Sequence, residues 1–171
     1  AAPVGLRYLW QVSTSCEVEV SNLVRGEADE FTTEVEEPVA STTLTLTANP
    51  QLVNTNNRTA DYDLKGEVNG ADQNVASIIG TTNGKNGATV WSVSAGPEFR
   101  LYYGTKLIIN MAEGYKITSI TLTTSDNYAI NGTAGLKAAT FDDGVSSVEI
   151  LHDGTSGTRK ITSIVITYIA E

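Results

Sequence analysis

Cysteine and histidine are almost missing from this 171-residue chain, which has one of each, Cys16 and His152. A single cysteine cannot form an intramolecular disulfide or a multi-cysteine metal site, so neither is expected. Cys16 is either a small buried apolar residue or a partner for intermolecular pairing. One histidine also leaves Ser-His-Asp, Cys-His and His-cluster zinc arrangements little to build on. His152 follows a predicted strand and precedes Asp153-Gly154, so we interpret it as an exposed turn histidine.

Basic residues and long apolar runs are scarce as well. The chain has 11 basic and 20 acidic residues, a formal net charge of -9 and a pI of about 4.5. This balance repels phosphate backbones and anionic membranes, so no nucleic-acid partner is expected. No apolar run approaches the roughly 20 residues that cross a bilayer, so no membrane insertion is expected either. The chain begins at Ala1 without Met, which suits either a processed, exported protein or simply a trimmed sequence. We expect an extracellular or cell-surface location.

What is abundant is Thr, Val, Ile, Asn, Ser and Gly. Thr, Val and Ile favour half-buried strands, and Asn and Gly favour turns, so the composition predicts an all-β protein. Strand and turn signals recur about every ten residues from Ser41 onward, which is typical of an antiparallel β-sandwich of the jelly-roll kind over residues 41–171. Gly104-Thr105 looks like the link of a hairpin between its two flanking strands. The predicted strands are Thr43–Thr47, Val75–Ile79, Thr89–Val93, Phe99–Tyr103, Lys106–Met111, Tyr115–Thr124, Leu136–Phe141, Val145–Leu151 and Lys160–Ile169.

Residues 1–40 differ from the rest and are predicted to form an N-terminal acidic arm. This segment contains eight acidic residues and two arginines, so it contributes -6 to the formal net charge of -9. The acidic segment Arg25–Pro38 has few apolar residues, which is typical of a solvated connection. We expect the arm to dock either on its own domain or on a neighbouring subunit, through an apolar stretch and an alternating one. The candidate docking residues are Leu6, Tyr8, Trp10, Val12, Val18 and Val20.

One strand pattern is written twice near the C-terminus. Lys-Ile-Thr-Ser-Ile occurs at residues 116–120 and again at 160–164. Residues two apart share a face of a regular strand, yet Ile117 lies three positions before Ile120, and Ile161 three before Ile164. One extra residue returns each first isoleucine to the core face. We therefore predict a β-bulge near Thr118-Ser119 and another near Thr162-Ser163.

This run of strands resembles a known family. The order of its elements resembles that of the small β-sandwich modules of secreted Bacteroidetes proteins. The order is two strands around a Gly-containing turn, the Lys-Ile-Thr-Ser-Ile strand, a Gly-rich segment and the closing copy of that strand. The resemblance covers about residues 42–168 and implies a jelly-roll or galactose-binding-like shape. It also implies a role in adhesion or glycan binding. It supplies no catalytic residue.

Acidic residues are the other candidates for chemistry. Paired carboxylates hydrolyse glycosides, but Asp142 and Asp143 point to opposite faces of a strand, and Asp61 and Asp63 stand in an Asn- and Thr-rich loop. Solvated turn acids are the favoured interpretation. A Ca²⁺ site built from these four residues, with Asp153, is a weaker alternative, because no EF-hand-like loop accompanies them. With no Gly-rich phosphate loop before a helix either, no cofactor and no enzymatic activity are expected.

Aromatic residues are the better candidates for binding. Trp91, Tyr102 and Tyr103 lie close together in the sequence, and one of two adjacent tyrosines in a strand must face outward if the other is buried. An exposed ring beside amides is typical of sugar recognition. The alternative is that Trp91 fills the core and the outward tyrosine is a scattered surface residue.

Two functions remain open at this point. The first is a non-catalytic surface module for adhesion or glycan binding. The second is a structural subunit of a fibre, pilus-like filament or particle coat, assembled from copies of itself through the N-terminal arm by strand addition to an exposed sheet edge.

Overall fold

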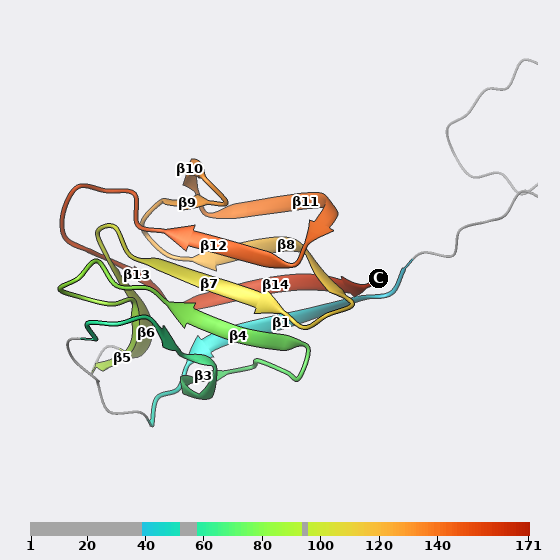
Figure 1. The fold of residues 1–171 in the computed structure, drawn as a ribbon, viewed down its shortest axis with the longest axis horizontal. Helices are drawn as coiled ribbons and strands as arrows, with labels where there is room; N and C mark the ends of the chain where they lie inside the picture. The colour runs from blue at the N-terminus through green and yellow to red at the C-terminus, as the bar shows by residue number, and fades with distance from the viewer. Residues whose placement is uncertain (1–38, 52–57, 94–95) are drawn as a thin grey trace, which may run out of the picture. The chain divides into compact units, whose positions relative to one another are not determined.

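The described part of the chain forms three antiparallel sheets (Figure 1). A computed structural model describes residues 39–51, 58–93 and 96–171, so the predicted arm lies outside the described residues apart from Val39 and Ala40. The first sheet has the order β11 (Ala138–Val145), β8 (Tyr115–Thr123), β14 (Ser163–Ala170), β1 (Ser41–Ala48), β3 (Val68–Asn69). The second has the order β10 (Thr133–Leu136), β9 (Tyr128–Ile130), β12 (Ser147–Leu151), β7 (Lys106–Met111), β4 (Val75–Gly80), β2 (Tyr62–Asp63). The third has the order β13 (Thr158–Ile161), β6 (Gly96–Tyr102), β5 (Thr89–Val93).

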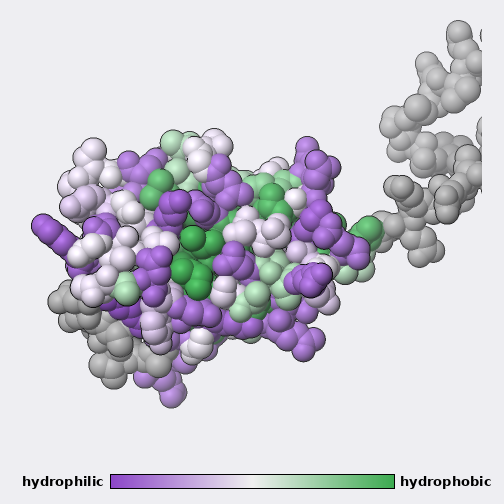
Figure 2. Space-filling view, in the orientation of Figure 1, coloured by the Kyte–Doolittle hydropathy of each residue, from purple (hydrophilic) through white to green (hydrophobic). Residues whose placement is uncertain are grey.

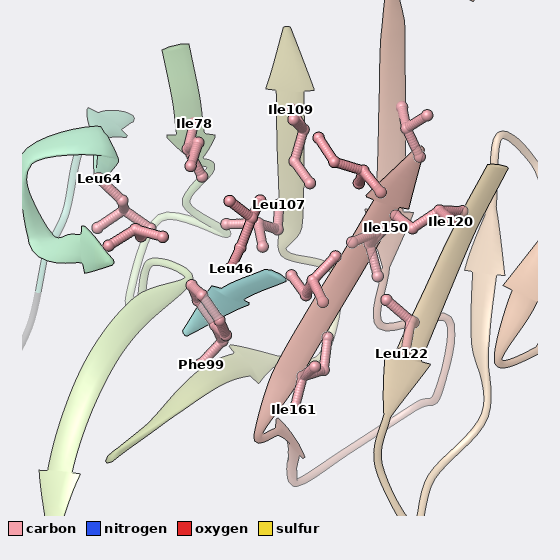
Figure 3. Packing of buried hydrophobic residues seen from close by; sticks show 14 of the residues in the cluster. Leu46, Leu64, Ile78, Phe99, Leu107, Ile109, Ile120, Leu122, Ile150 and Ile161 are labelled. Atoms are coloured by element: carbon pink, nitrogen blue, oxygen red, sulfur yellow. The ribbon is translucent and has the colours of Figure 1, made fainter. Parts of the chain in front are cut away.

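The all-β sandwich prediction is confirmed, because these sheets pack together around one apolar core. Alternation produces the core: every second residue of β7, and of β14 as far as Tyr168, is buried, and the residues between them are only half-buried. Isoleucine and leucine side chains from all three sheets meet in the interior (Figure 3). Near the edge of the second sheet a short 3-10 turn, Lys65–Glu67, follows the buried Leu64.

The first predicted bulge is confirmed. In the pairing of β8 with β14, Ser119 lies opposite Thr167 and Ile117 opposite Tyr168, which leaves Thr118 as the extra residue. Ile117 and Ile120 are both buried as a result. The Thr118 hydroxyl donates to the Thr167 carbonyl oxygen at 3.2 Å, so the bulged residue is tied back to its partner strand.

The second copy breaks in a different way from the predicted bulge. β13 ends at Ile161 in the third sheet and β14 begins at Ser163 in the first, so Thr162 forms a corner between two sheets. Ile161 and Ile164 are still both buried. The extra residue is therefore present, but it lets the chain pass from the third sheet to the first and does not form a bulge within one pair of strands.

The predicted hairpin through Gly104-Thr105 is wrong. β6 pairs with β5 and β13, whereas β7 pairs with β12 and β4, so the two strands belong to different sheets. The amide of Thr105 donates to the Tyr102 carbonyl oxygen at 2.9 Å, which closes a tight turn, and Gly104 has φ +74°. A hairpin and a corner share this turn chemistry, and only the partners of each strand distinguish them.

Candidate ligand-binding surface

Trp91 lies on the outer face of the third sheet. Its neighbour Val90 points into the core, so alternation turns the indole outward, where it is half-buried. The guanidinium of Arg100 stacks on the ring at 3.9 Å from the centroid. Arg100 Nε also donates to the carboxylate of Glu98 at 2.6 Å, and Lys160 Nζ lies 3.5 Å from the same carboxylate. Trp91 therefore does not fill the core, where its neighbour Val90 and Phe99 are buried, and one indole face is already covered by a cation.

The adjacent tyrosines divide as alternation requires. Tyr102 is half-buried at the end of β6, while Tyr103 is 44% exposed just beyond the strand. The turn that follows Tyr103 is held from the second sheet: the amide of Gly104 donates to the His152 carbonyl oxygen at 3.0 Å, and the His152 amide donates to the Thr105 carbonyl oxygen at 3.1 Å. Tyr103 is thus an exposed ring on a fixed turn.

Tyr62 is a second exposed ring that sequence reasoning missed. It is 48% exposed, and the guanidinium of Arg58 stacks on it at 3.8 Å from the ring centroid. Arg58 is itself held by Glu67 at 2.5 Å. The Asn-rich sequence around Tyr62 predicts a loop, and so Tyr62 was not among the candidate binding residues. The one signal that could have pointed to it is its position between two aspartates.

The loop between β4 and β5 links the two tyrosine segments. The amide of Thr82 donates to the Asp61 carboxylate at 2.9 Å, and the next residue, Asn83, donates its side-chain amide to the Tyr103 carbonyl oxygen at 2.9 Å. Asn83 also closes its own loop, since its amide donates to the Asn86 carbonyl oxygen at 3.0 Å. We call Tyr62, Tyr103 and the loop Thr81–Asn86 the tyrosine rim. It combines two exposed rings with a loop whose amides and hydroxyls are hydrogen-bonded.

The rim suits a ligand with both apolar and hydroxyl-bearing surfaces. An aromatic ring covers C–H faces, and fixed amide and hydroxyl groups exchange hydrogen bonds with hydroxyls. Asn83, Asn86 and Thr82 supply the amides and the hydroxyl, and Lys85 is the exposed cation of the loop. Trp91 lies outside the rim on the face of the third sheet, so the structure does not bring the three sequence-predicted rings together in one cluster.

His152 is buried, which corrects the expectation of an exposed turn histidine. It is 2% exposed, and its Nδ1 accepts a hydrogen bond from the Gly154 amide at 3.1 Å. Loss of hydration, and then the nearby Arg159 guanidinium, lower the pKa of His152 below its usual value. Its backbone anchors the turn that carries Tyr103, so His152 supports the rim and is not itself open to a ligand.

The aspartates singled out as possible calcium ligands serve the backbone or face solvent. The Asp63 carboxylate accepts from the Lys65 and Ile78 amides at 2.9 and 3.0 Å, and Asp61 binds Thr82. Asp142 and Asp143 are exposed on β11, and Asp153 pairs with Arg159 at 2.5 Å. In the part of the chain that the structure describes, no three His, Cys, Asp or Glu residues gather in a way that holds a metal ion.

Two other surface features are less specific. Figure 2 shows apolar side chains gathered near the middle of the face that it draws. In the second sheet, the half-buried Ile79 of β4 and Ile108 of β7 are register partners. The ion pair of Lys106 with Glu149, at 2.6 Å, lies beside them. On the first sheet, an open depression is lined by small side chains of β8 and β11. Neither combines an exposed ring with fixed polar groups.

Comparisons with known proteins identify no relative: no family model, no curated protein and no solved structure matches this chain. The chain is an all-β protein with several antiparallel sheets. Within the described ranges, no helix is long and apolar enough to cross a membrane.

Proposed function

We propose that this chain is a non-catalytic interaction module of an extracellular or cell-surface protein, which binds a glycan or cell-surface ligand through the tyrosine rim. The observation that carries the proposal is that the exposed rings of Tyr62 and Tyr103 stand in segments tied to one loop, because Thr82 donates to Asp61 beside Tyr62 and Asn83 donates to the Tyr103 carbonyl oxygen. The resemblance to the surface modules of Bacteroidetes, seen over residues 42–168, points the same way.

The geometry favours a neutral sugar surface over a strongly charged ligand. The cation beside Tyr62 is already paired, because Arg58 binds Glu67. Lys85 therefore adds one exposed positive charge to a rim whose other groups are aromatic rings, amides and hydroxyls. Such groups bind sugars by ring stacking and hydroxyl exchange, with little dependence on salt.

A glycan array probed with the full chain tests this proposal. Tyr103→Ala and Tyr62→Ala are each expected to weaken binding about fivefold or more, since one lost aromatic contact is worth about 1 kcal/mol. Thr121→Ala, at an exposed position of β8 away from the rim, serves as the matched control. Absence of any glycan hit, or hits that tolerate both tyrosine variants, contradicts the proposal.

A second candidate is a structural subunit that assembles through the N-terminal arm. It is favoured by one observation: among the described residues, β1 pairs with β14 on one side over Ser41–Leu46, but with β3 on the other side only at Thr47 and Ala48. An unpaired strand edge is a template for a strand from another chain.

The size of the intact protein tests this second function. In full-length chains, Val18→Lys and Val20→Lys are expected to reduce assembly strongly, whereas Glu17→Gln and Glu19→Gln, which keep the same length and shape, are expected to preserve it. Sedimentation velocity at several protein concentrations gives the measurement. A wild-type chain that stays monomeric at every concentration excludes the structural-subunit function.

A further inference from the structure

His152 follows the last residue of β12, and its backbone holds the turn that carries Tyr103. The Gly104 amide donates to the His152 carbonyl oxygen at 3.0 Å, and the His152 amide donates to the Thr105 carbonyl oxygen at 3.1 Å. The Tyr103 amide itself donates to the Gly157 carbonyl oxygen at 3.3 Å. The connection from β12 to β13 (Figure 1) is therefore attached to the turn of the tyrosine rim at both of its ends.

The side chain of His152 also fixes the course of the β12–β13 connection, residues 152–157. Its Nδ1 accepts a hydrogen bond from the Gly154 amide at 3.1 Å, and the residue is 2% exposed. A Cβ atom built on Gly154 lies 2.7 Å from His152 Cε1 and 3.1 Å from Arg159 Nη2, so the chain at Gly154 packs closely against both side chains. A change at Nδ1 therefore has to move the chain at Gly154.

The hydrogen bond between Gly154 and His152 exists only for the neutral imidazole. Nδ1 accepts a hydrogen bond when the ring proton is on Nε2, but an imidazolium carries a proton on both nitrogens. Protonation therefore turns Nδ1 into a donor that faces the Gly154 N–H group, with no acceptor between the two. Nε2 has no hydrogen-bond partner in the part of the chain that the structure describes, so it offers the added charge no compensation.

The groups around the imidazole disfavour its protonation in this arrangement. Loss of hydration is the largest cause of the lowered pKa of His152, and the guanidinium of Arg159, in β13, is the next. Asp153 in the connection and Asp126 between β8 and β9 act in the opposite direction, but Asp153 is paired with Arg159 at 2.5 Å. Tyr128 of β9, the strand beside β12, stays uncharged because burial raises its pKa. The turn of the rim consists of uncharged residues.

We propose that His152 is a positioning residue of the tyrosine rim, and that its protonation releases the β12–β13 connection and weakens ligand binding at Tyr103 as pH falls. The proposal rests on the rim function proposed above and adds a pH dependence to it. In the closed form the connection holds Tyr103 on a fixed turn, so the ring is in place before the ligand arrives. In the released form the three backbone hydrogen bonds between turn and connection are lost, and the ligand has to order the turn itself.

The direction of the pH dependence follows from the protonation of the two forms. The closed form keeps His152 neutral, whereas in the released form the imidazole is hydrated and takes up a proton near its ordinary pKa of about 6.5. The closed form is therefore fully stable above about pH 6.5 and loses stability as pH falls toward its own lowered pKa. At pH 5.5 the equilibrium moves toward the released form by up to about tenfold.

Amide hydrogen exchange of the full chain tests the release without any ligand. Between pH 7.5 and pH 5.5, the protection of the Tyr103 and Gly104 amides, corrected for the intrinsic exchange rate, is expected to fall about fivefold in the wild type. In His152→Asn, whose side-chain oxygen accepts from Gly154 but does not titrate, it is expected to stay constant. The amide of Ile109, in the middle of β7, is the reference for global unfolding and should remain better protected at both pH values.

A second measurement keeps the test valid if His152→Asn does not fold. Because His152 is the only histidine, its imidazole signals in an NMR titration of the wild type are unambiguous. The loss of protection at Tyr103 is expected to begin near pH 6.5 and to level off below the pH at which the ring itself titrates. Protection that does not change with pH, an equal fall in His152→Asn, a response confined to Gly154, or equal protection of Tyr103 and Ile109 overturns the proposal.

Binding is measured with the full chain at the same two pH values, on the glycan that the array identifies. The wild type is expected to bind at least about twofold more weakly at pH 5.5, and His152→Asn to bind with the same affinity at both. Wild-type binding that is independent of pH, or an equal weakening of both proteins, overturns the role of His152 in binding. If no glycan binds at either pH, the rim function fails, and the exchange result still decides whether protonation of His152 releases the turn.

Discussion

The imidazole of His152 is 2% exposed, and its Nδ1 accepts the Gly154 amide, so the neutral form carries its proton on Nε2. Burial, followed by repulsion from Arg159, lowers its pKa in the folded protein, while the nearby Asp153 opposes this shift. The unfolded chain therefore binds this proton more readily than the folded one. Stability contributed by neutral His152 is complete above about pH 6.5 and is lost as pH falls from there toward the lowered folded-state pKa.

His152→Asn tests this prediction, because an Asn oxygen replaces Nδ1 as the acceptor but does not titrate. At pH 7 the variant is expected to be about 1–3 kcal/mol less stable, since a buried ring is lost. The difference should shrink between pH 7 and pH 5, as only the wild type takes up the extra proton on unfolding. Urea denaturation at several pH values measures this, and a constant difference across that range contradicts the assignment.

At the scale of elements, the placement of β3 beside β1 depends on one glycine. Gly70 has φ +86°, and a Cβ atom built there lies 2.0 Å from the Thr45 carbonyl oxygen. Local sequence signals a turn at Asn69-Gly70, but it does not tell which strand the turn packs against. The same is true of Gly104. The sequence predicts a turn there, but it does not tell that the two flanking strands belong to different sheets.

Gly70→Ala is expected to destabilise the protein by at least about 2 kcal/mol, since it adds a backbone clash to a left-handed conformation. Gly114→Ala separates the two effects, because Gly114 has φ +81° in open space and should cost only about 1 kcal/mol. Gly66→Ala, with neither clash nor positive φ, should be nearly neutral. Chemical denaturation ranks the three variants, and equal losses at Gly70 and Gly114 rule out a close approach to Thr45.

At the scale of the whole molecule, Tyr168 ties the closing strand of the first sheet to the chain that enters the second. Its hydroxyl donates to the Asp72 carboxylate at 2.7 Å and accepts from the Asn74 side-chain amide at 2.9 Å. Tyr168 is 3% exposed, and its pKa is raised by burial and then by the bond to Asp72. Residues almost 100 positions apart in the sequence are joined here.

Tyr168→Phe keeps the packing and removes both hydrogen bonds. We expect a loss of about 1–3 kcal/mol in the free energy of unfolding, because a partly buried carboxylate and an amide lose their partner. Tyr103→Phe, at an exposed tyrosine, should change it by less than about 0.5 kcal/mol. Thermal or urea unfolding compares the two, and equal effects indicate that the Tyr168 bonds add nothing to stability.

By itself, the sequence determined the all-β class, most strands and the irregularity at Thr118, because alternation and turn chemistry act between neighbours in the chain. It also indicated that one of the adjacent Tyr102 and Tyr103 faces outward, and the structure shows that this one is Tyr103. Only the tertiary structure decided that the repeated strand bulges once and turns a corner once, since Thr162 meets a different set of partner strands from Thr118. It alone buried His152 and tied Asp61 and the Tyr103 backbone to one loop through Thr82 and Asn83, because these contacts form between residues distant in sequence, where no local pattern records them.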